Sequence, residues 1–541
     1  MSASITCTSL SFAWSDGTPV FDDLQIVFGP GRSGLVGVNG SGKSTLLKLI
    51  AGELTPAHGT VRVAGEVGYL PQNVTLDTGL RVDEALGIAV VRAALHAIEA
   101  GDVAEKHFAT VGDDWDVEER ALATLGELGL GHIDLDRTIG EVSGGESVLL
   151  RLAALLLRRP DVLLLDEPTN NLDVYARRRL YDAVASWSGV MVVVSHDREL
   201  LELVDQIADL RSGEVNWYGG NYSAYEEALA TEQDAAERMM RVAEADLKKQ
   251  KRELVEAHSK LAKRTRYANK MYENKREPRA VMKLKKRSAQ VSAGKHRLLH
   301  EERLADAKER LDEAVEAVRD DDEIRVDLPY TAVPPGRTVL TLLDLELRYG
   351  ARVRGGLDLR GPERIALIGR NGAGKTTLLR TIAGELEPVA GETTAHVPLR
   401  FLPQRLDVLD DGRTVVENVA RFAPGATNNR IRARLARFLF KGARADQPAA
   451  TLSGGERFRA ALAALMLAEP APQLLMLDEP TNNLDMASVR QLTTALESYE
   501  GALIVASHDL PFLESIGITR WLLMEEGELK EITPEAVGYP A

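Results

Sequence analysis

Short apolar runs alternate with amphipathic stretches in both halves of the chain, a pattern typical of α/β domains. Two of the runs, Gly34–Val38 and Ile365–Ile368, have the length of a buried strand. Each leads through a glycine-rich turn into a helical apolar run, Leu46–Ile50 in the first half and Leu378–Ile382 in the second. The same succession of strand, turn and helix therefore occurs twice. It predicts an α/β protein built from two copies of one domain.

The region between the two copies has a seven-residue period. Its apolar positions are Met240, Leu247, Leu254 and Leu261, followed after a gap by Leu304, Leu311 and Val318. Heptad spacing is the pattern of helices that pack along a shared seam. Two such stretches, joined by a middle that lacks the pattern, predict an antiparallel α-helical hairpin with its tip at about 265–297.

These patterns divide the chain into a first domain at 1–224, a hairpin linker at 225–325 and a second domain at 326–541. The first copy is the longer one between its glycine-rich turn and the helical run that begins near Ser143. The additional residues fall near 91–123. We expect them to form a small helical arm that docks a partner, although a surface insertion without a partner fits the same pattern.

Composition narrows the class of protein. The chain has 541 residues, a net charge of −15 and one cysteine, Cys7. A single cysteine excludes a disulfide framework and a cysteine-based metal site, which fits a reducing cytosol. The N-terminus lacks the basic start and apolar run of a secretion signal. The most apolar region, Val148–Leu165, contains four charged residues and predicts a buried helix followed by a strand. We therefore expect a cytoplasmic protein with no membrane domain.

Each glycine-rich turn matches G-x-x-x-x-G-K-[ST], the loop that binds nucleotide phosphates. Its glycines allow successive backbone amides to surround a phosphate, and the helix that follows adds its positive dipole end. The lysine reaches the β and γ oxygens, so we expect ATP as the ligand. The candidate ATP-binding residues are Gly37, Asn39, Gly40, Ser41, Gly42, Lys43, Ser44 and Thr45, and in the second copy Gly369, Asn371, Gly372, Ala373, Gly374, Lys375, Thr376 and Thr377.

An apolar strand ends in two acids in each copy, Asp166 and Glu167 in the first and Asp478 and Glu479 in the second. We expect the aspartates to lie beside Mg²⁺ with the hydroxyl that follows the phosphate-loop lysine. The glutamates are candidate catalytic bases that polarise the attacking water. The metal-ligand candidates on this reasoning are Ser44, Asp166, Thr376 and Asp478.

A later apolar strand in each copy is followed by a histidine, His196 or His508. Taken alone, a histidine at the end of a strand favours a structural role. Because both histidines occur at the same place after the same acidic pair, we interpret them as catalytic residues that sense the γ-phosphate.

A Ser-Gly-Gly-Glu block begins at Ser143 and again at Ser453, each time before an apolar helical run. Alone, the block indicates a helix cap. Placed shortly before the acidic strand in both copies, it makes the chain resemble the ATP-binding cassette family from near Ser9 to about Ile532. The resemblance implies two P-loop NTPase cassettes in tandem that face head to tail within one monomeric chain. Val142 departs from the family pattern, which leaves open whether the two sites work at equal rates.

The resemblance also implies further site residues. Each ATP would lie between the phosphate loop of one cassette and the signature block of the other. The signature residues are Ser143, Gly144 and Gly145, and Ser453, Gly454 and Gly455. Gln72 and Gln404 match the glutamine that links the metal to the helical subdomain. Trp14 and Tyr349 match the aromatic residue that stacks on adenine, although Phe12 is an alternative to Trp14.

Positive charge is concentrated in the middle of the predicted linker. Between Lys248 and Arg297 there are 18 Lys and Arg against four acids, whereas a solvated coiled-coil face carries both signs. Cations interleaved with aromatic residues favour binding to RNA phosphates and bases. The candidate RNA-binding residues are Arg264, Arg266, Tyr267, Lys270, Tyr272, Lys275, Arg276, Arg279, Lys283, Lys285, Lys286 and Arg287.

Two tandem cassettes with a helical linker, which follows the aromatic-rich segment from Trp217 to Tyr225, resemble the ABC-F subfamily of translational ATPases. In that subfamily the linker enters the ribosomal exit site and approaches the peptidyl-transferase centre beside the P-site tRNA. The resemblance implies the ribosome as the partner, through large-subunit RNA and P-site tRNA. It also implies a role in antibiotic resistance by ribosome protection or in tuning translation.

Two other classes of protein share some of these features. An ATPase subunit of a membrane transporter would borrow its channel from another protein, but such a subunit has no use for a basic hairpin. A nucleic-acid repair ATPase also pairs cassettes with coiled coil. Its coils are usually much longer or accompanied by zinc-binding cysteines, which this sequence lacks.

Overall fold

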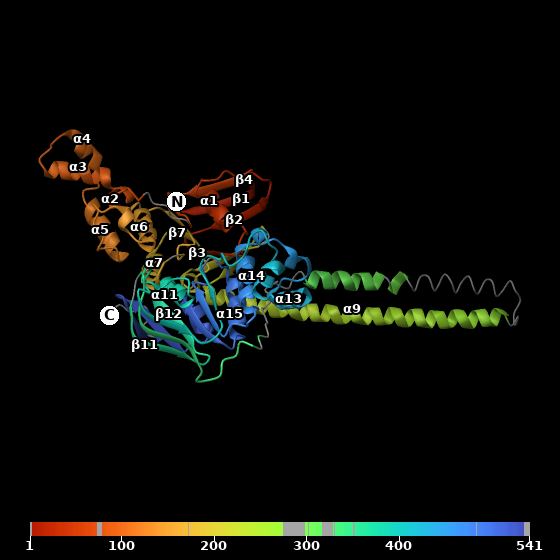
Figure 1. Ribbon diagram of the computed structural model, residues 1–541. Helices are drawn as coiled ribbons and strands as arrows, with labels where there is room; N and C mark the ends of the chain where they lie inside the picture. Colours follow the sequence, from red (N-terminus) through yellow and green to blue (C-terminus); the bar gives the residue numbers. More distant parts are fainter. Residues whose placement is uncertain are drawn as a thin grey trace. The chain divides into compact units, whose positions relative to one another are not determined.

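The computed structural model describes residues 3–72, 78–170, 172–211, 213–273, 298–300, 302–315, 328, 330–349, 352–482 and 484–534. The chain forms two compact units (Figure 1). One comprises Met1–Ser223 together with Glu323–Ala541, and the other is Ala224–Asp322. The first unit therefore contains both predicted α/β domains, and the second contains the predicted linker.

The first α/β domain contains two sheets. Its strands are β1 (Ser4–Ala13), β2 (Pro19–Phe28), β3 (Gly31–Val36), β4 (His58–Ala64), β5 (Val67–Leu70), β6 (Val162–Asp166), β7 (Val190–Val194), β8 (Gln206–Arg211) and β9 (Glu214–Gly219). A three-stranded sheet has the order β2-β1-β4, and a six-stranded sheet has the order β5-β6-β7-β3-β8-β9. In the larger sheet β3 runs parallel to β7 and β8, so the carboxyl ends of β3, β6 and β7 meet at one edge.

The helices of this domain cover the larger sheet and extend beyond it. They are α1 (Lys43–Ile50), α2 (Val82–Ala85), α3 (Ala89–Glu99), α4 (Glu105–Val111), α5 (Val117–Glu127), α6 (Gly144–Leu157), α7 (Val174–Ser186) and α8 (Arg198–Leu201), with a 3-10 turn η1 (Ile139–Glu141). The residues at 91–123, expected to form an arm, include most of α3, all of α4 and the first part of α5.

The second α/β domain has one continuous sheet of nine strands. Its elements are β10 (Thr338–Glu346), β11 (Arg352–Arg360), β12 (Arg364–Gly369), α11 (Lys375–Ile382), β13 (Ala390–Ala395), β14 (Leu399–Leu402), α12 (Val415–Phe422), α13 (Asn428–Leu435), η2 (Ala436–Phe438), η3 (Gly442–Asp446), η4 (Ala449–Thr451), α14 (Gly454–Met466), β15 (Leu474–Asp478), α15 (Met486–Glu497), β16 (Ala502–Ala506), α16 (Leu510–Ser515), β17 (Arg520–Glu525) and β18 (Glu528–Ile532). The strand order is β13-β10-β11-β18-β17-β12-β16-β15-β14. The pair of Arg352 and Glu528 joins its antiparallel part to its parallel part.

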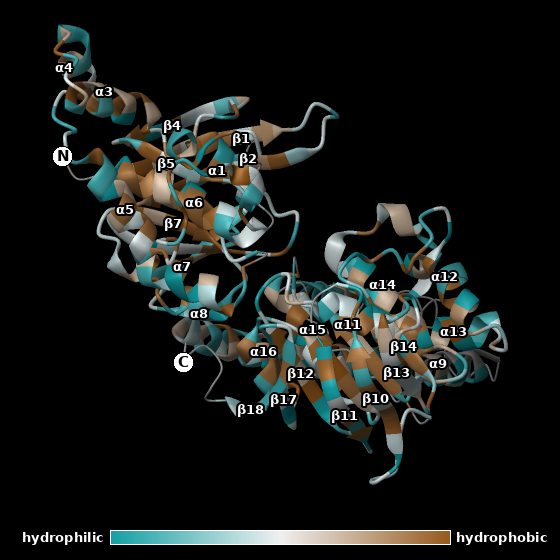
Figure 2. Ribbon diagram, turned by 60° about the vertical axis from the view of Figure 1, so that its left-hand side comes forward, coloured by the Kyte–Doolittle hydropathy of each residue, from teal (hydrophilic) through white to brown (hydrophobic). Residues whose placement is uncertain are grey.

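The core of each domain lies on both faces of its parallel strands. Every residue of β6, β7, β15 and β16 is buried, as expected for parallel strands covered by helices. Figure 2 shows hydrophobic residues concentrated along strands such as β12 and along α6. Since each buried Val or Leu contributes about 1.5–3 kcal/mol, these strands fix the sheet edge from which the candidate catalytic side chains project.

The second unit is built around one long helix, α9 (Tyr222–Glu273), of 52 residues. The heptad residues Met240, Leu247 and Leu254 are half-buried, and their neighbours are mostly exposed. Residues 302–315 form another helical segment, in which Arg310 lies 3.4 Å from Asp246 of α9. Residues 274–297, most of the predicted tip, lie outside the described residues, so the closed hairpin stays a prediction.

Candidate nucleotide-binding sites

The two phosphate loops connect β3 to α1 and β12 to α11. Gly37 has φ 148° and Gly369 has φ 154°, in the region that favours glycine. A Cβ at Gly37 would lie 2.4 Å from the Leu210 carbonyl oxygen, and one at Gly369 would lie 2.3 Å from that of Met524. Both glycines are therefore required for the close approach of the loop to a neighbouring strand.

The phosphate-loop lysines lie inside their loops. The Lys43 ammonium donates to the Gly37 carbonyl at 2.7 Å, and that of Lys375 donates to the Gly369 carbonyl at 2.7 Å. Burial lowers the pKa of both lysines, against the effect of the neighbouring acids. In the second site the Lys375 ammonium also lies 3.0 Å from His508 Nε2. Each loop thus holds one cation at the wall of its cavity.

The aspartate of each acidic pair sits at the carboxyl end of a fully buried strand. The Ser44 hydroxyl donates to Asp166 at 3.0 Å, and Tyr69 donates to the same carboxylate at 3.4 Å. Both oxygens of Asp478 are buried without a hydrogen bond of normal geometry to the described residues. Burial raises the pKa of both carboxyls. A buried acid with unused oxygens beside a hydroxyl fits a hard cation such as Mg²⁺.

The glutamates Glu167 and Glu479 follow these aspartates in an unusual conformation. Both have φ 48°, which L-residues rarely adopt and which typically costs about 1–3 kcal/mol. Their amides donate at 2.8 Å to the carbonyls of Val194 and Ala506, the last residues of β7 and β16. This anchoring turns each glutamate side chain out of its strand and towards the phosphate loop.

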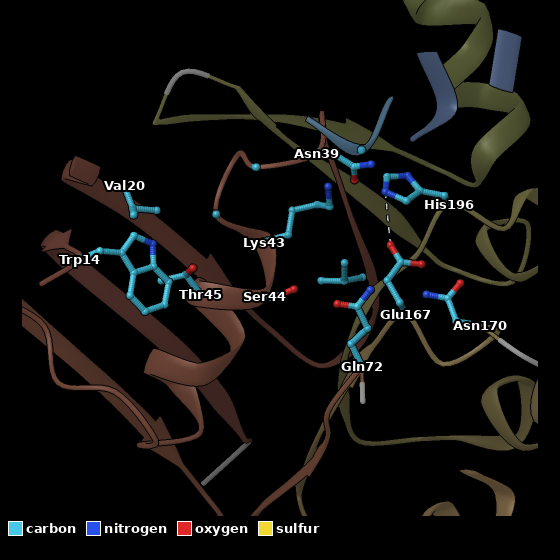
Figure 3. A pocket seen from close by; sticks show the side chains of 14 residues that line it. Trp14, Val20, Asn39, Lys43, Ser44, Thr45, Gln72, Glu167, Asn170 and His196 are labelled. Carbon is cyan, nitrogen blue, oxygen red and sulfur yellow. Dashed lines mark ion pairs between the residues drawn. The ribbon is translucent and has the colours of Figure 1, made fainter. Parts of the chain in front are cut away.

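Each of these glutamates faces the predicted histidine. His196 Nε2 lies 3.3 Å from Glu167 in the first site, and His508 Nε2 lies 3.2 Å from Glu479 in the second. Burial raises the pKa of Glu167 to about 8 and that of Glu479 to about 7. Burial also lowers the pKa of His196 to about 3 and that of His508 well below its usual value. Both imidazoles are therefore neutral at neutral pH. Figure 3 shows Glu167, His196, Lys43 and Gln72 around one cavity.

The signature serines begin helices α6 and α14. Ser143 accepts a hydrogen bond from the Glu146 amide at 3.3 Å, and Ser453 accepts one from the Glu456 amide at the same distance. Each glutamate carboxylate accepts from the serine amide in return, which completes a capping box. The cap orients the first turn of each helix and leaves the next residue facing a cavity.

Each cavity is completed by the signature block of the other α/β domain. Gly454 lines the cavity that contains Lys43, Ser44 and Gln72. The cavity of the second phosphate loop includes Gly144 and Gly145 among its lining residues. Other predicted residues at this second cavity are Asn371, Gly372, Gly374, Lys375, Thr376, Thr377, Gln404, Asp478, Glu479 and His508. The structure therefore brings together parts that are far apart in the sequence.

Two site residues had no predicted role. The Asp485 carboxylate accepts a hydrogen bond from the backbone N–H of Asn39 at 2.9 Å, and the Asp173 carboxylate accepts one from the backbone N–H of Asn371 at 3.3 Å. Each aspartate also caps the helix that follows it, α15 or α7. The repeated Asn-Asn-Leu-Asp after both acidic pairs was the available signal, but it does not reveal that the aspartates reach the opposite phosphate loop.

Comparison with known proteins identifies the family. The ABC transporter family model matches residues 23–170 and 356–482. The chain is 32% identical to the probable ATP-binding protein YbiT of Escherichia coli O157:H7, over 96% of this chain and 94% of that protein. It is 31% identical to mouse ATP-binding cassette sub-family F member 3, over 94% of this chain and 69% of that protein. This chain belongs to the ABC-F subfamily.

The ABC-F protein is also similar to the tylosin resistance ATP-binding protein TlrC of Streptomyces fradiae, with 34% identity over 91% of this chain and 92% of that one. Among solved structures, the archaeal ribosome recycling factor in its complex with a ribosomal stalk protein matches with TM-score 0.54 and 19% identity, covering 96% of this chain and 89% of that chain. That likeness shows the fold. The predictions of tandem P-loop cassettes and of ATP hydrolysis are confirmed.

The two adenine-stacking candidates of this ABC-F protein have different surroundings. Trp14 lines the first cavity and makes an edge-to-face contact with Phe12, with ring centroids 5.2 Å apart. Phe12 itself belongs to the core. Tyr349 is 65% exposed and is not among the described residues that line the second cavity. Trp14 therefore lines the cavity of a phosphate loop, and the contact of Tyr349 with adenine stays a prediction.

The RNA-binding candidates of the ABC-F protein fall partly within α9. Arg266, Tyr267 and Lys270 are exposed there. The side chains of Arg264 and Tyr272 are not described. The candidates outside the described residues are Lys275, Arg276, Arg279, Lys283, Lys285, Lys286 and Arg287. No described helix is both long enough and apolar enough to cross a membrane.

Proposed function

We propose that this protein is a cytoplasmic, monomeric, ribosome-bound ATPase. In its ATP-bound state it inserts the interdomain linker at the tRNA exit site, towards the peptidyl-transferase centre and the P-site tRNA. It leaves when ATP is hydrolysed. Its cellular role is to protect the ribosome from an antibiotic or to tune translation. The observation that carries the proposal is that each phosphate loop shares its cavity with the signature block of the other cassette.

This arrangement supports a closing mechanism. An ATP on Lys43 would contact the amino end of α14 at Gly454, so the nucleotide would hold the two cassettes together. Loss of the γ-phosphate removes the group that both sides bind. Hydrolysis would then allow the cassettes to separate. The same argument applies to Lys375 and Gly144.

The hydrolytic step is assigned to residues of the sheet edge. Glu167 and Glu479 take a proton from the attacking water, and the neutral imidazoles of His196 and His508 orient the carboxylate and the γ-phosphate. Bound Mg²⁺ would neutralise charge on the β- and γ-phosphates. Its ligands would be Ser44, Asp166 and Gln72 in the first site and Thr376, Asp478 and Gln404 in the second. Trp14 stacks on the adenine of the first ATP.

The linker supports the ribosome as the partner. From Lys248 to Glu273, α9 carries nine Lys and Arg against three acids, although the whole chain is acidic. A row of exposed cations on a long helix attracts RNA phosphates and has no purpose in a transporter motor. Among similar proteins, the tylosin resistance protein is named for a resistance function. That likeness supports a protective role for this chain.

Sedimentation with ribosomes tests the proposal. The Glu167→Gln, Glu479→Gln double variant is expected to bind ATP without hydrolysing it and therefore to pellet with ribosomes in ATP but not in ADP. The unmodified protein should pellet less, because it hydrolyses its ATP and leaves. If the double variant stays in the supernatant with ribosomes but is pelleted by membranes, the transporter alternative replaces the proposal.

The contribution of the linker is tested on described residues. Replacing Arg266 and Lys270 by Gln should weaken ribosome binding and reduce its dependence on salt, while basal ATPase is retained. The matched control replaces Arg238 and Arg241, two α9 cations that pair with Asp234 and Glu237 on the same helix. Equal weakening in both pairs would mean that the charge of α9 acts without regard to position. Unchanged binding in the first pair would remove these two cations from the interface.

A further inference from the structure

The contacts between the two cassettes are not equivalent at the two ATP sites. One contact occurs at both sites, because Asp485 accepts a hydrogen bond from the backbone N–H of Asn39 and Asp173 accepts one from the backbone N–H of Asn371. Around the second site the first cassette adds two contacts whose residues are replaced by Ala487, Val489 and Val38 at the corresponding positions of the first site. They come from the opening turns of α7, immediately after Asp173.

Arg177 is the central residue of these additional contacts. Its Nη1 donates to Asp197 at 3.2 Å and to the backbone carbonyl of His508, in the second cassette, at 3.5 Å. The side chains of Arg177 and Asp197 are 11% and 7% exposed. His508 in turn lies 3.2 Å from Glu479 and 3.0 Å from Lys375. A buried guanidinium of one cassette therefore supports the histidine that faces the catalytic glutamate of the other.

A second contact comes from Tyr175, two residues before Arg177 on α7. The guanidinium of Arg370, in the second phosphate loop, lies 5.3 Å from the ring centroid of Tyr175 on α7. This distance is within the range of a cation–π interaction. Tyr175 and Arg177 thus form two neighbouring contacts with the strand end and the phosphate loop of the second site.

The corresponding residues around the first site cannot form these contacts. Counted from Asp485, the residues that correspond to Tyr175 and Arg177 are Ala487 and Val489, and the residue that corresponds to Arg370 is Val38. None of these three side chains carries a charge or a ring. Since the catalytic residues are the same in both sites, the difference lies in what holds them.

We propose that Arg177 is a positioning residue of the second ATP site only, where it fixes the His508 backbone and through it the alignment of Glu479. The inference rests on the proposed role of Glu479 as a catalytic base. Arg177 also lowers the pKa of Glu479 against the effect of burial, which agrees with its place beside this site. The first site is expected to be insensitive to Arg177, because Asp197 keeps hydrogen bonds with Tyr181 at 2.8 Å and with the Leu200 amide at 3.1 Å.

The test measures steady-state ATPase with one site silenced. With Glu167→Gln, only the second site hydrolyses, and we expect Arg177→Met to lower kcat about tenfold with KM for ATP changed less than twofold. With Glu479→Gln, only the first site hydrolyses, and Arg177→Met should change kcat less than twofold. Arg177→Lys should restore a large part of the lost kcat, because it returns a donor to His508. Arg179→Met, on the exposed side of the same helix, is the matched control.

The outcomes separate a positioning role from a structural one. An equal loss of kcat in both backgrounds, with a lower Tm, would overturn the inference, because Arg177 would then only hold the fold together. No loss in either background would also overturn it. If Glu479→Gln alone leaves ATPase unchanged, the assignment of the base fails separately. A loss of kcat in the otherwise unmodified chain that Arg177→Lys restores would still support the positioning role.

Discussion

The two cassettes have the same candidate catalytic residues but differ in the contacts made elsewhere in each domain. In the helical region of the first, Arg92 pairs with Asp83 at 3.0 Å and with Asp136 at 2.7 Å, and Asp83 is buried. At the position of Asp83 the second cassette has Val416, which packs in an apolar core. The same fold therefore accommodates an ion-paired carboxylate or an apolar side chain at this position. Repetition of motifs does not by itself imply equal sites.

The largest expected effect on ATPase comes from replacing the glutamate that both cassettes share. Replacing both Glu167 and Glu479 by Gln should reduce ATPase by about 10²–10⁴-fold, because each site loses its general base. Each single variant should retain the rate of the other site, so the two single variants measure the ratio of the site rates. Equal hydrolysis rates at the two sites would mean that the different contacts in the two cassettes do not affect hydrolysis. Substantial ATPase in the double variant would show that another group acts as the base.

The next effect concerns stability and the ionic region of the first cassette. Replacing Arg92 by Met leaves the Asp83 carboxylate buried with one of its partners removed, which should lower the free energy of unfolding by about 3 kcal/mol. Arg81 and Arg92 hold the pKa of Asp83 below its usual value despite burial. This contribution is therefore present at neutral pH and is lost as the pH falls into the acidic range. Chemical denaturation at pH 7 and below pH 3 measures both.

The matched control is a substitution of Val416, the apolar residue that corresponds to Asp83. Replacing Val416 by Ala removes apolar volume but no charge, so its effect should be nearly independent of pH. If the two variants show the same pH dependence, the ionic group is not what distinguishes the two helical regions.

A smaller effect tests the crossed cavities. Gly454 and Gly144 each have open space where a Cβ would lie, so a side chain there need not disturb the fold. Gly454→Glu places a carboxylate near the phosphates of the first site and should lower ATPase about thirtyfold when Glu479→Gln leaves only that site active. Gly144→Glu should do the same to the second site, measured with Glu167→Gln. Inhibition of the wrong site by either change would contradict the crossed arrangement.

The smallest effect concerns pH. A general base works when deprotonated, so activity is lost as the pH falls through its pKa. Burial raises the pKa of Glu479 to about 7 and that of Glu167 to about 8, so each carboxyl is partly protonated at pH 7. The kcat of both single variants should therefore rise as the pH is raised from 7 to 9. Rate profiles from pH 6 to pH 9 measure the two midpoints.

The sequence predicted those parts of the sites that are contiguous in the chain. The phosphate loops, the acidic pairs and the signature serines are short motifs whose local conformation follows from glycine, buried strands and helix caps. The structure brings residues of the phosphate loops and of the acidic pairs to the same cavities. The heptad positions Met240, Leu247 and Leu254 also lie on one half-buried stripe of α9.

The remaining features depend on contacts between segments that are far apart. The sequence does not show that Asp173 and Asp485 reach the opposite loop, or that Arg177 reaches His508, because these contacts depend on how the cassettes face one another. Tyr349 lies between β10 and β11, where its ring is 65% exposed, and its contact with adenine stays a prediction.

The uninterrupted length of α9 has a mechanical consequence. The helix begins at Tyr222, which belongs to the unit formed by the cassettes, and continues for 52 residues. At 1.5 Å per residue it is a lever about 80 Å long, so a rotation of about 5° at its base would move the far end by about 7 Å. A displacement of that size exceeds the length of a hydrogen bond more than twofold. A small rotation at the base of α9 would then be enough to make or break contacts at its other end.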